Sequence, residues 1–167
     1  MPAFDAATRE VIFGKFTWTE SQTRRGMIVP DGQWVTANIT QIGLPYFSND
    51  EPRIWRGKCH CKVALSLEKA FDDLEVAGLL HLIRTIDGCY VPRHTLWNPK
   101  NGLSTHSWGI AIDLNAKLIP YGSTKQQDPR VVRIFANHGF LFGHKGSGLW
   151  KNTKDGMHAE YVYDPRK

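Results

Sequence analysis

The chain is built around the stretch Ser104-Thr105-His106-Ser107-Trp108-Gly109-Ile110-Ala111-Ile112-Asp113-Leu114-Asn115. From residue 110 onward, apolar residues alternate with small or polar ones, which predicts a strand with one face on a core. The other face presents Asp113, and His106 precedes the strand in a loop. Because an unpartnered buried carboxylate is costly, Asp113 needs a partner, and a metal ion is one candidate.

A second stretch near the C-terminus, residues 150–161, supplies the remaining polar groups. His158 and Glu160 are separated by one residue, so a strand would point both side chains to the same face. His106, Asp113 and His158 together form a set of two histidines and one carboxylate. This composition suits one catalytic zinc ion with its fourth position left to water. Zinc lowers the pKa of such water to roughly 7, and Asp155 is the candidate to accept its proton.

Composition indicates a soluble globular protein, because 41% of the residues are hydrophobic and 22% are charged. We expect one domain over residues 1–167, with an irregular N-terminal part over 1–60 and the metal-site core over 62–163. No apolar run approaches the roughly 20 residues of a membrane span, so membrane insertion is not expected. The first ten residues lack the pattern of a secretory signal, which predicts synthesis in a cytoplasm.

The formal net charge of +5 favours an anionic partner, which could be a cell-wall polymer, a membrane surface or a nucleic acid. The basic residues are scattered and accompany no nucleic-acid-binding motif, so we expect no nucleic acid as partner. The cysteines Cys59, Cys61 and Cys89 are too few for a disulfide framework. Their Cys-x-Cys spacing is a weak metal signal, and we interpret these residues as structural or incidental.

Four further elements follow from local patterns. An apolar stripe predicts a helix over residues 62–83, with Gly78 as a point where it ends or kinks. Residues 85–90 indicate a short strand. Asp128-Pro129 predicts a helix start, and His138-Gly139 predicts its end. A buried strand begins at Phe140.

Arg93 follows the strand predicted over residues 85–90 and precedes the first metal stretch. One interpretation is an ordinary surface residue. The other places its guanidinium in the site, where its fork of donors binds a carboxylate or stabilises an oxyanion. The residue pattern leaves both open.

Together these motifs resemble the zinc peptidases of the D-alanyl-D-alanine carboxypeptidase type, family M15. The family pattern is SxHxxGxAxD, followed many residues later by a Trp and then by (D/E)xxH. Here it is formed by Ser104, His106, Gly109, Ala111 and Asp113, then by Trp150, Asp155 and His158. The form HSWGIAIDLN, with GCYVPR upstream, looks like the branch common in bacteriophages. The resemblance covers residues 62–161 in order.

The resemblance implies zinc ligation by His106, Asp113 and His158, with Asp155 as general base and later proton donor. It implies that Arg93 and Ser104 hold the substrate or the transition state. The implied fold is α+β, of the DD-peptidase and hedgehog type, in which a small antiparallel sheet carries the metal site and packs against helices. This chain departs from the common pattern at Tyr-Val-Pro-Arg and in a longer loop before Trp150.

Family members cut stem peptides of peptidoglycan, which are therefore the expected partner. We expect an L-alanyl-D-glutamate endopeptidase of the phage lysin type that acts as a monomer. It would reach the wall after phage-mediated release or as part of a virion. One alternative is a D,D-carboxypeptidase or dipeptidase acting on D-Ala-D-Ala, and another is a non-catalytic phage or wall-binding protein. Glu160 orients a metal ligand by hydrogen bond, or replaces Asp155 as the base.

Overall fold

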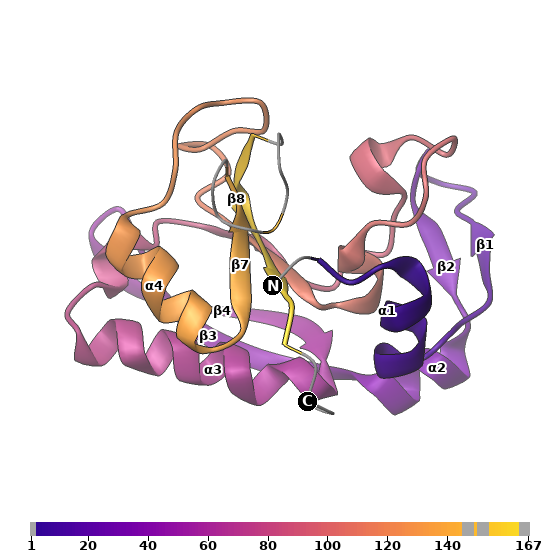
Figure 1. Cartoon of the computed structure of the whole chain (residues 1–167), viewed down its shortest axis with the longest axis horizontal. Helices are drawn as coiled ribbons and strands as arrows, with labels where there is room; N and C mark the ends of the chain where they lie inside the picture. Colours follow the sequence, from indigo (N-terminus) through magenta and orange to yellow (C-terminus); the bar gives the residue numbers. More distant parts are fainter. Residues whose placement is uncertain (1–2, 145–148, 150–153, 164–167) are drawn as a thin grey trace.

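The computed structural model describes residues 3–144, 149 and 154–163. Helices and small antiparallel sheets are mixed along the chain, which confirms the predicted α+β class. Figure 1 shows α3 running along one side of the molecule, with α4 above it and α1, α2, β1 and β2 gathered at the other end. None of the described helices combines the length and apolar character of a membrane span.

The helices are α1 (Ala6–Phe13), α2 (Gly32–Asn38), α3 (Cys61–Val76) and α4 (Pro129–Asn137), with 3-10 turns η1 (Leu80–Leu82), η2 (Thr95–Trp97) and η3 (Thr105–Trp108). The strands are β1 (Trp18–Glu20), β2 (Ile28–Pro30), β3 (Ile39–Ser48), β4 (Glu51–His60), β5 (Ile86–Gly88), β6 (Ala111–Leu114), β7 (Phe140–Gly143) and β8 (Asp155–Tyr161). They form two hairpins, β1-β2 and β3-β4, and one four-stranded sheet in the order β5-β6-β8-β7.

The four-stranded sheet is antiparallel throughout, and its two faces differ as the alternation predicts. The apolar residues Ile110, Ile112 and Leu114 are fully buried. On the core side, Phe135 of α4 packs against Phe142 of β7, with ring centroids 5.3 Å apart. Burying one such side chain contributes about 1.5–3 kcal/mol, so the core side anchors the sheet and leaves its other face for polar groups.

The helix predicted to start at Asp128-Pro129 is confirmed as α4. The Asp128 carboxylate accepts a hydrogen bond of 2.9 Å from the backbone N–H of Arg130 and so caps the first turn. Gly139 follows the helix with a φ of +84°, the left-handed conformation in which glycine carries little steric cost.

The expectation of irregular structure over residues 1–60 is wrong. Residues 39–60 form the β3-β4 hairpin, with ten residues in each strand. Its loop consists of Asn49 and Asp50, both with positive φ, as type I′ hairpin turns require. Pro45 and Pro52 lie within these strands and are tolerated because neither strand of a two-stranded sheet needs partners on both edges.

The helix predicted over residues 62–83 is shorter than expected and ends at Val76. Gly78 adopts a φ of +68°, and the backbone N–H of Leu79 donates to the carbonyl of Leu74. The apolar pattern continues past this end because Leu80 and Ile83 are buried outside the helix. Similarly, the strand expected over residues 85–90 is limited to Ile86–Gly88.

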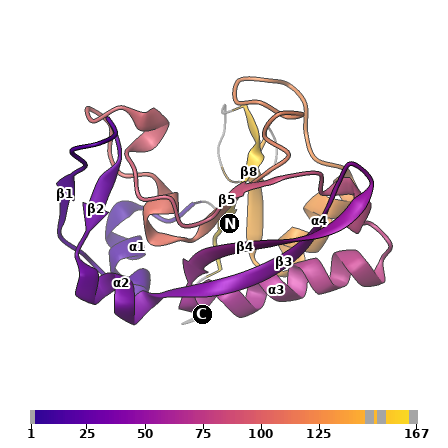
Figure 2. The ribbon, with the colours of Figure 1, turned by 180° about the vertical axis from the view of Figure 1, so that it is seen from behind.

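The β3-β4 hairpin joins α3 to the sheet that carries the polar face. Figure 2 shows the hairpin from behind, with α3 running along it. The backbone N–H of His60 donates to the carbonyl of Gly109 at 2.9 Å, and that of Tyr90 donates to Lys58 at 2.9 Å. These bonds fix the loop before β6 against the end of the hairpin.

Candidate metal centre

Strand register brings the predicted ligands together. Asp113 on β6 and His158 on β8 are directly opposite, so their side chains share one face of the sheet. His106 lies in η3, immediately before β6. Among the described residues, these three form a group of side chains that could hold a metal ion.

His106 is held by the two ends of its short helix. The hydroxyl of Ser104 accepts from the backbone N–H of His106 at 3.4 Å, and Gly109 ends the turn with a φ of +67°. A Cβ on Gly109 would lie 2.8 Å from the backbone nitrogen of His60. Only glycine therefore fits both the left-handed turn and the close approach of the hairpin.

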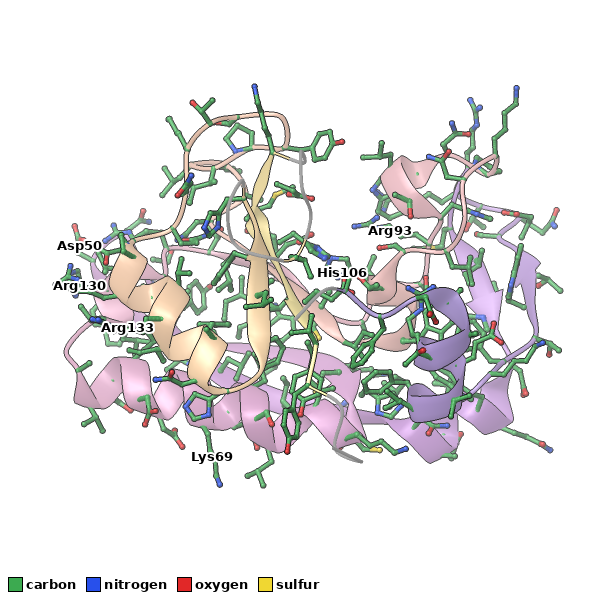
Figure 3. The ribbon with its side chains drawn as sticks, in the orientation of Figure 1. Asp50, Lys69, Arg93, His106, Arg130 and Arg133 are labelled. Carbon is green, nitrogen blue, oxygen red and sulfur yellow. The ribbon has the colours of Figure 1, made fainter. Side chains whose placement is uncertain are left out.

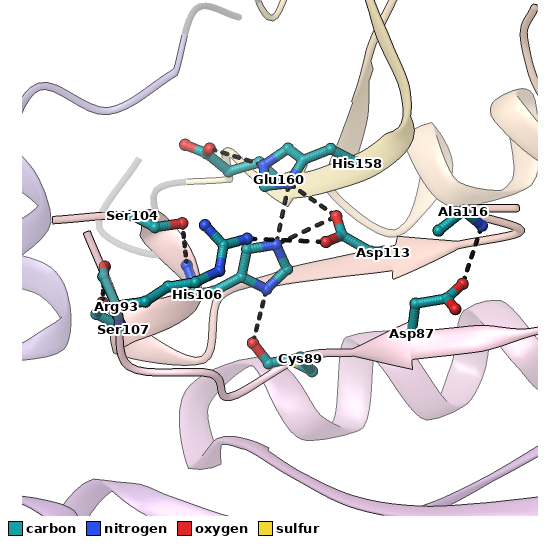
Figure 4. Close-up of polar contacts among 10 residues, drawn as sticks. All are labelled: Asp87, Cys89, Arg93, Ser104, His106, Ser107, Asp113, Ala116, His158 and Glu160. Carbon is teal, nitrogen blue, oxygen red and sulfur yellow. Dashed lines mark hydrogen bonds and ion pairs between the residues drawn. The ribbon is translucent and has the colours of Figure 1, made fainter. Parts of the chain in front are cut away.

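The three ligand atoms have the spacing of a tetrahedral site (Figure 4). Nε2 of His106 and Nδ1 of His158 are 3.1 Å apart. Oδ1 of Asp113 lies 3.2 Å from the first of these atoms and 3.1 Å from the second. For zinc–ligand bonds of about 2.0–2.1 Å, tetrahedral ligand atoms lie about 3.3 Å apart. The residues thus fit a metal ion at three corners of a tetrahedron.

Each histidine ring is oriented by an acceptor on its far side. Nδ1 of His106 lies 2.9 Å from the carbonyl of Cys89, and Nε2 of His158 lies 3.4 Å from Oε2 of Glu160. Because these oxygens only accept, the nitrogens facing them carry the protons. When a metal ion displaces any proton from the other two nitrogens, their lone pairs would face it, as metal ligation requires.

The charges of the cluster are strongly coupled. Burial alone would raise the pKa of Asp113, but the rings of His106 and His158 outweigh it and hold that pKa well below its usual range. Burial disfavours the charged ring of His158, yet its hydrogen bonds to Asp113 and Glu160 raise its pKa to about 10. Without a metal the cluster therefore keeps a proton that metal binding must displace.

Asp155 begins β8 and lines the same cleft as the cluster. A register irregularity between β7 and β8 accompanies this position, and a Cβ on the next residue, Gly156, would lie 2.5 Å from the carbonyl of Lys125. The Oδ1 atom of Asp155 is buried and has no hydrogen-bond partner among the described residues. Burial raises the pKa of this carboxyl.

Arg93 points into the site rather than to solvent, as Figures 3 and 4 show. Its Nη2 lies 3.9 Å from Oδ2 of Asp113, and its side chain is 15% exposed. The hydroxyl of Ser107 accepts from the backbone N–H of Arg93 and donates to its carbonyl, both at 2.9 Å. Ser104 also lines the cleft, while its hydroxyl accepts the N–H of His106.

A cleft of about 630 Å³ opens over the cluster. Sequence reasoning missed three residues that form or support its wall: Arg9 on α1, Trp97 in η2, and Ser107. Ser107 lies within the first motif and offered a signal by its position. Trp97 lies between Arg93 and Ser104 and offered a signal by that position, whereas Arg9 lies far from the motifs and offered none. The motif residue Trp150 lies outside the described residues.

Comparison with known proteins agrees with this geometry. Residues 97–161 match the peptidase M15 family model described as D-alanyl-D-alanine carboxypeptidase. No curated protein and no solved structure matched the chain. The matched segment contains the two histidines and the aspartate of the cluster. Over residues 97–161 the chain is therefore similar to the peptidase M15 family, and this segment holds all three residues of the candidate metal centre.

Proposed function

We propose that this protein is a zinc-dependent peptidase that hydrolyses an amide bond in the stem peptides of peptidoglycan. One observation carries the proposal: three candidate ligand atoms at tetrahedral spacing face a cleft that also holds the half-buried carboxylate of Asp155. A metal-binding set without a nearby proton acceptor would suit a structural site. The acid in the cleft supports catalysis.

The residues divide the reaction among them. A zinc ion held by His106, Asp113 and His158 would polarise the scissile carbonyl and increase the acidity of water. Asp155 takes the proton from the attacking water and delivers it to the leaving amine. The Arg93 guanidinium offsets the negative charge that develops on the carbonyl oxygen, or binds a substrate carboxylate. Glu160 holds the ring of His158 in place.

Two bonds in the stem peptide are candidates. The motif forms HSWGIAIDLN and GCYVPR support cleavage between L-alanine and D-glutamate, as in phage lysins. The description of the matching family model supports removal of the terminal D-alanine. We favour the endopeptidase and keep the D,D-carboxypeptidase as the second candidate.

Digestion of purified peptidoglycan separates these candidates. New termini are identified by mass spectrometry, with and without a chelator. New amino groups on D-glutamate that disappear with the chelator support the endopeptidase, whereas released D-alanine supports the carboxypeptidase. Binding of zinc without cleavage of any wall type would contradict both and favour a wall-binding protein.

The setting we propose for this activity is lysis of a bacterial wall by a phage-encoded enzyme, either released into the cell envelope or carried in a virion. The same two motif forms support it. The test compares intact cells with cells whose membrane has been permeabilised from within. Lysis that requires the protein on the wall side of the membrane is expected, and an absence of lysis in both arms would contradict the setting.

A further inference from the structure

A second guanidinium reaches the cleft from outside the segment that matches the family. Arg9 lies on α1 and lines the cleft. Its guanidinium carbon is 4.3 Å from the centre of the Trp108 ring. The indole N–H of Trp108 donates to the carbonyl of Gly14 at 2.9 Å, which ties η3 to the residue that ends α1. This stacking holds Arg9 in the wall of the cleft.

The hydrogen-bonding capacity of Arg9 is incompletely used. Its Nε is buried and has no hydrogen-bond partner among the described residues. The charge of Glu160 acts on Arg9, yet Oε1 of Glu160 is also buried without a partner in the described part of the chain. The two groups therefore attract each other without a hydrogen bond. An unsatisfied buried donor is costly, and an acceptor brought by a ligand would remove that cost.

The two guanidiniums of the cleft occupy different places. Arg93 lies against Asp113, one of the metal-binding residues. Arg9 lies over Trp108 and near Glu160, which contacts the other side of His158. A single substrate carboxylate beside the metal would need only one of these two guanidinium groups. The guanidinium of Arg9 therefore suits a substrate that carries another carboxylate away from the scissile bond.

We propose that Arg9 binds a carboxylate of the peptide substrate and so selects peptides with a negative charge at that place. The inference rests on the proposed function and deepens it by naming what the substrate must carry. A stem peptide offers two sources of this group, an internal carboxylate and the C-terminal carboxylate. Both present the same planar acceptor to the guanidinium.

The experiment uses four synthetic stem peptides: both carboxylates free, only the internal one amidated, only the terminal one amidated, and both amidated. Each is assayed with the zinc-loaded parent protein, with Arg9→Gln and with Arg9→Lys. Arg133→Gln is the matched control, because Arg133 is exposed on α4 and lies on the outer surface (Figure 3). Thermal unfolding and zinc content are measured for every variant.

We expect Arg9→Gln to lower kcat/KM about 10- to 100-fold on the fully charged peptide, the effect of one charge-assisted hydrogen-bonded contact. Amidation of the carboxylate that Arg9 binds should lower kcat/KM of the parent protein by a similar factor. On that amidated peptide, kcat/KM of Arg9→Gln should be close to that of the parent protein. Arg9→Lys should fall between parent and Arg9→Gln, and the control should match the parent. The amidation that removes the effect of Arg9→Gln on kcat/KM shows which carboxylate Arg9 binds.

An equal loss for Arg9→Gln on all four peptides would overturn the inference, because it would mean that Arg9 serves only to pack α1 against η3. Unchanged kcat/KM on all of them would overturn it as well. If the parent cleaves none of the peptides, the proposed function fails, and the inference fails with it. The activity of the parent therefore separates the two failures.

Discussion

Asp155 and Glu160 are two carboxylates of the same strand, and their contacts separate their roles. Glu160 is 1% exposed and contacts the ring of His158 on the side away from the cluster. Asp155 lines the cleft and leaves Oδ1 without a partner among the described residues. A group that moves protons must be reachable by water, whereas a group that orients a ligand must not be free to move. The geometry therefore favours Asp155 as the base.

Asp155→Ala should keep the fold and the bound zinc but lose hydrolysis. General base catalysis contributes about 10²- to 10⁴-fold, so kcat should fall by that factor while the zinc content stays at the level of the parent. Rate and zinc content are measured on the same preparation. If the variant cleaves as fast as the parent, Asp155 is not the general base, and Glu160 becomes the candidate for that role.

Glu160→Gln should lower the affinity for zinc and leave the proton transfer by Asp155 intact. The amide still presents an acceptor to His158 but loses the negative charge, so zinc affinity should fall about 10- to 100-fold. Activity should return when zinc is added in excess, which Asp155→Ala does not allow. Zinc titration followed by hydrolysis distinguishes the two variants. A Glu160→Gln protein that binds zinc as tightly as the parent would contradict the orienting role.

Two of the candidate ligands were predictable because the side chains of a strand alternate with a fixed period. Asp113 and His158 lie on strands whose polar positions could be counted directly in the sequence. Arg93 was predictable only in part, because its orientation depends on Ser107, which holds its backbone. Arg9 was not predictable, since its place in the cleft depends on how α1 packs against Trp108.

Among the elements, α3 depends on an unusual cap. His60 is fully buried, and its Nδ1 accepts from the backbone N–H of Lys62 at 3.1 Å. Its Nε2 lies 3.0 Å from the carbonyl of Phe13, so the ring caps α3 and holds the end of α1 at once. Both contacts require the neutral ring with its proton on Nε2. This places His60 of the Cys-His-Cys stretch in a structural role.

The stability of the protein should therefore fall in mild acid. Burial lowers the pKa of His60 to about 4, below the value of about 6.5 in an unfolded chain. The unfolded state then binds the proton more readily, so the stabilisation is complete above about pH 6.5 and is lost as the pH falls towards 4. The loss amounts to about 3 kcal/mol.

The free energy of unfolding in urea, measured at several pH values, tests this. His60→Asn keeps a side-chain acceptor for the cap but has no proton to gain, so its stability should change less over the same interval. Equal slopes for the parent and this variant between pH 6.5 and 4 would assign the acid sensitivity to other groups.

The hairpin shows why element boundaries were harder to predict than the site. Residues 39–60 combine glycine and proline with apolar residues, and that composition favours short, broken segments. The pairing of β3 with β4 overrides it, because each residue gains a partner across the hairpin. The helix α4, in contrast, follows its local signals at Asp128 and Gly139. Local capping is readable from sequence, whereas pairing depends on a partner strand.

In the whole molecule, the N-terminal elements are part of the same core as the metal-binding sheet. Phe13 of α1 is 1% exposed, and its ring lies 5.2 Å from that of His60 and 6.4 Å from that of Tyr161 on β8. The first and last described elements therefore share buried surface. One domain over residues 1–167 stays a prediction, and it is longer than the segment that matches the family.

A single cooperative unfolding transition is expected for the chain, seen at the same midpoint by far-UV circular dichroism and by tryptophan fluorescence. Phe13→Ala should lower the free energy of unfolding by about 3–5 kcal/mol and shift both signals together. Two separate transitions, or a shift of only one signal, would show that residues 1–60 unfold independently of the metal-binding part.

The proposed activity depends on one zinc ion held by His106, Asp113 and His158. The measurement is to remove metal from the protein with a chelator, dialyse, and follow the hydrolysis of peptidoglycan peptides as zinc is added back. Activity should rise from near zero in proportion to added zinc and reach a plateau at one equivalent, while His106→Ala stays inactive at that ratio. Full activity in the metal-free protein, or none after one equivalent of zinc is bound, would contradict a zinc-dependent peptidase.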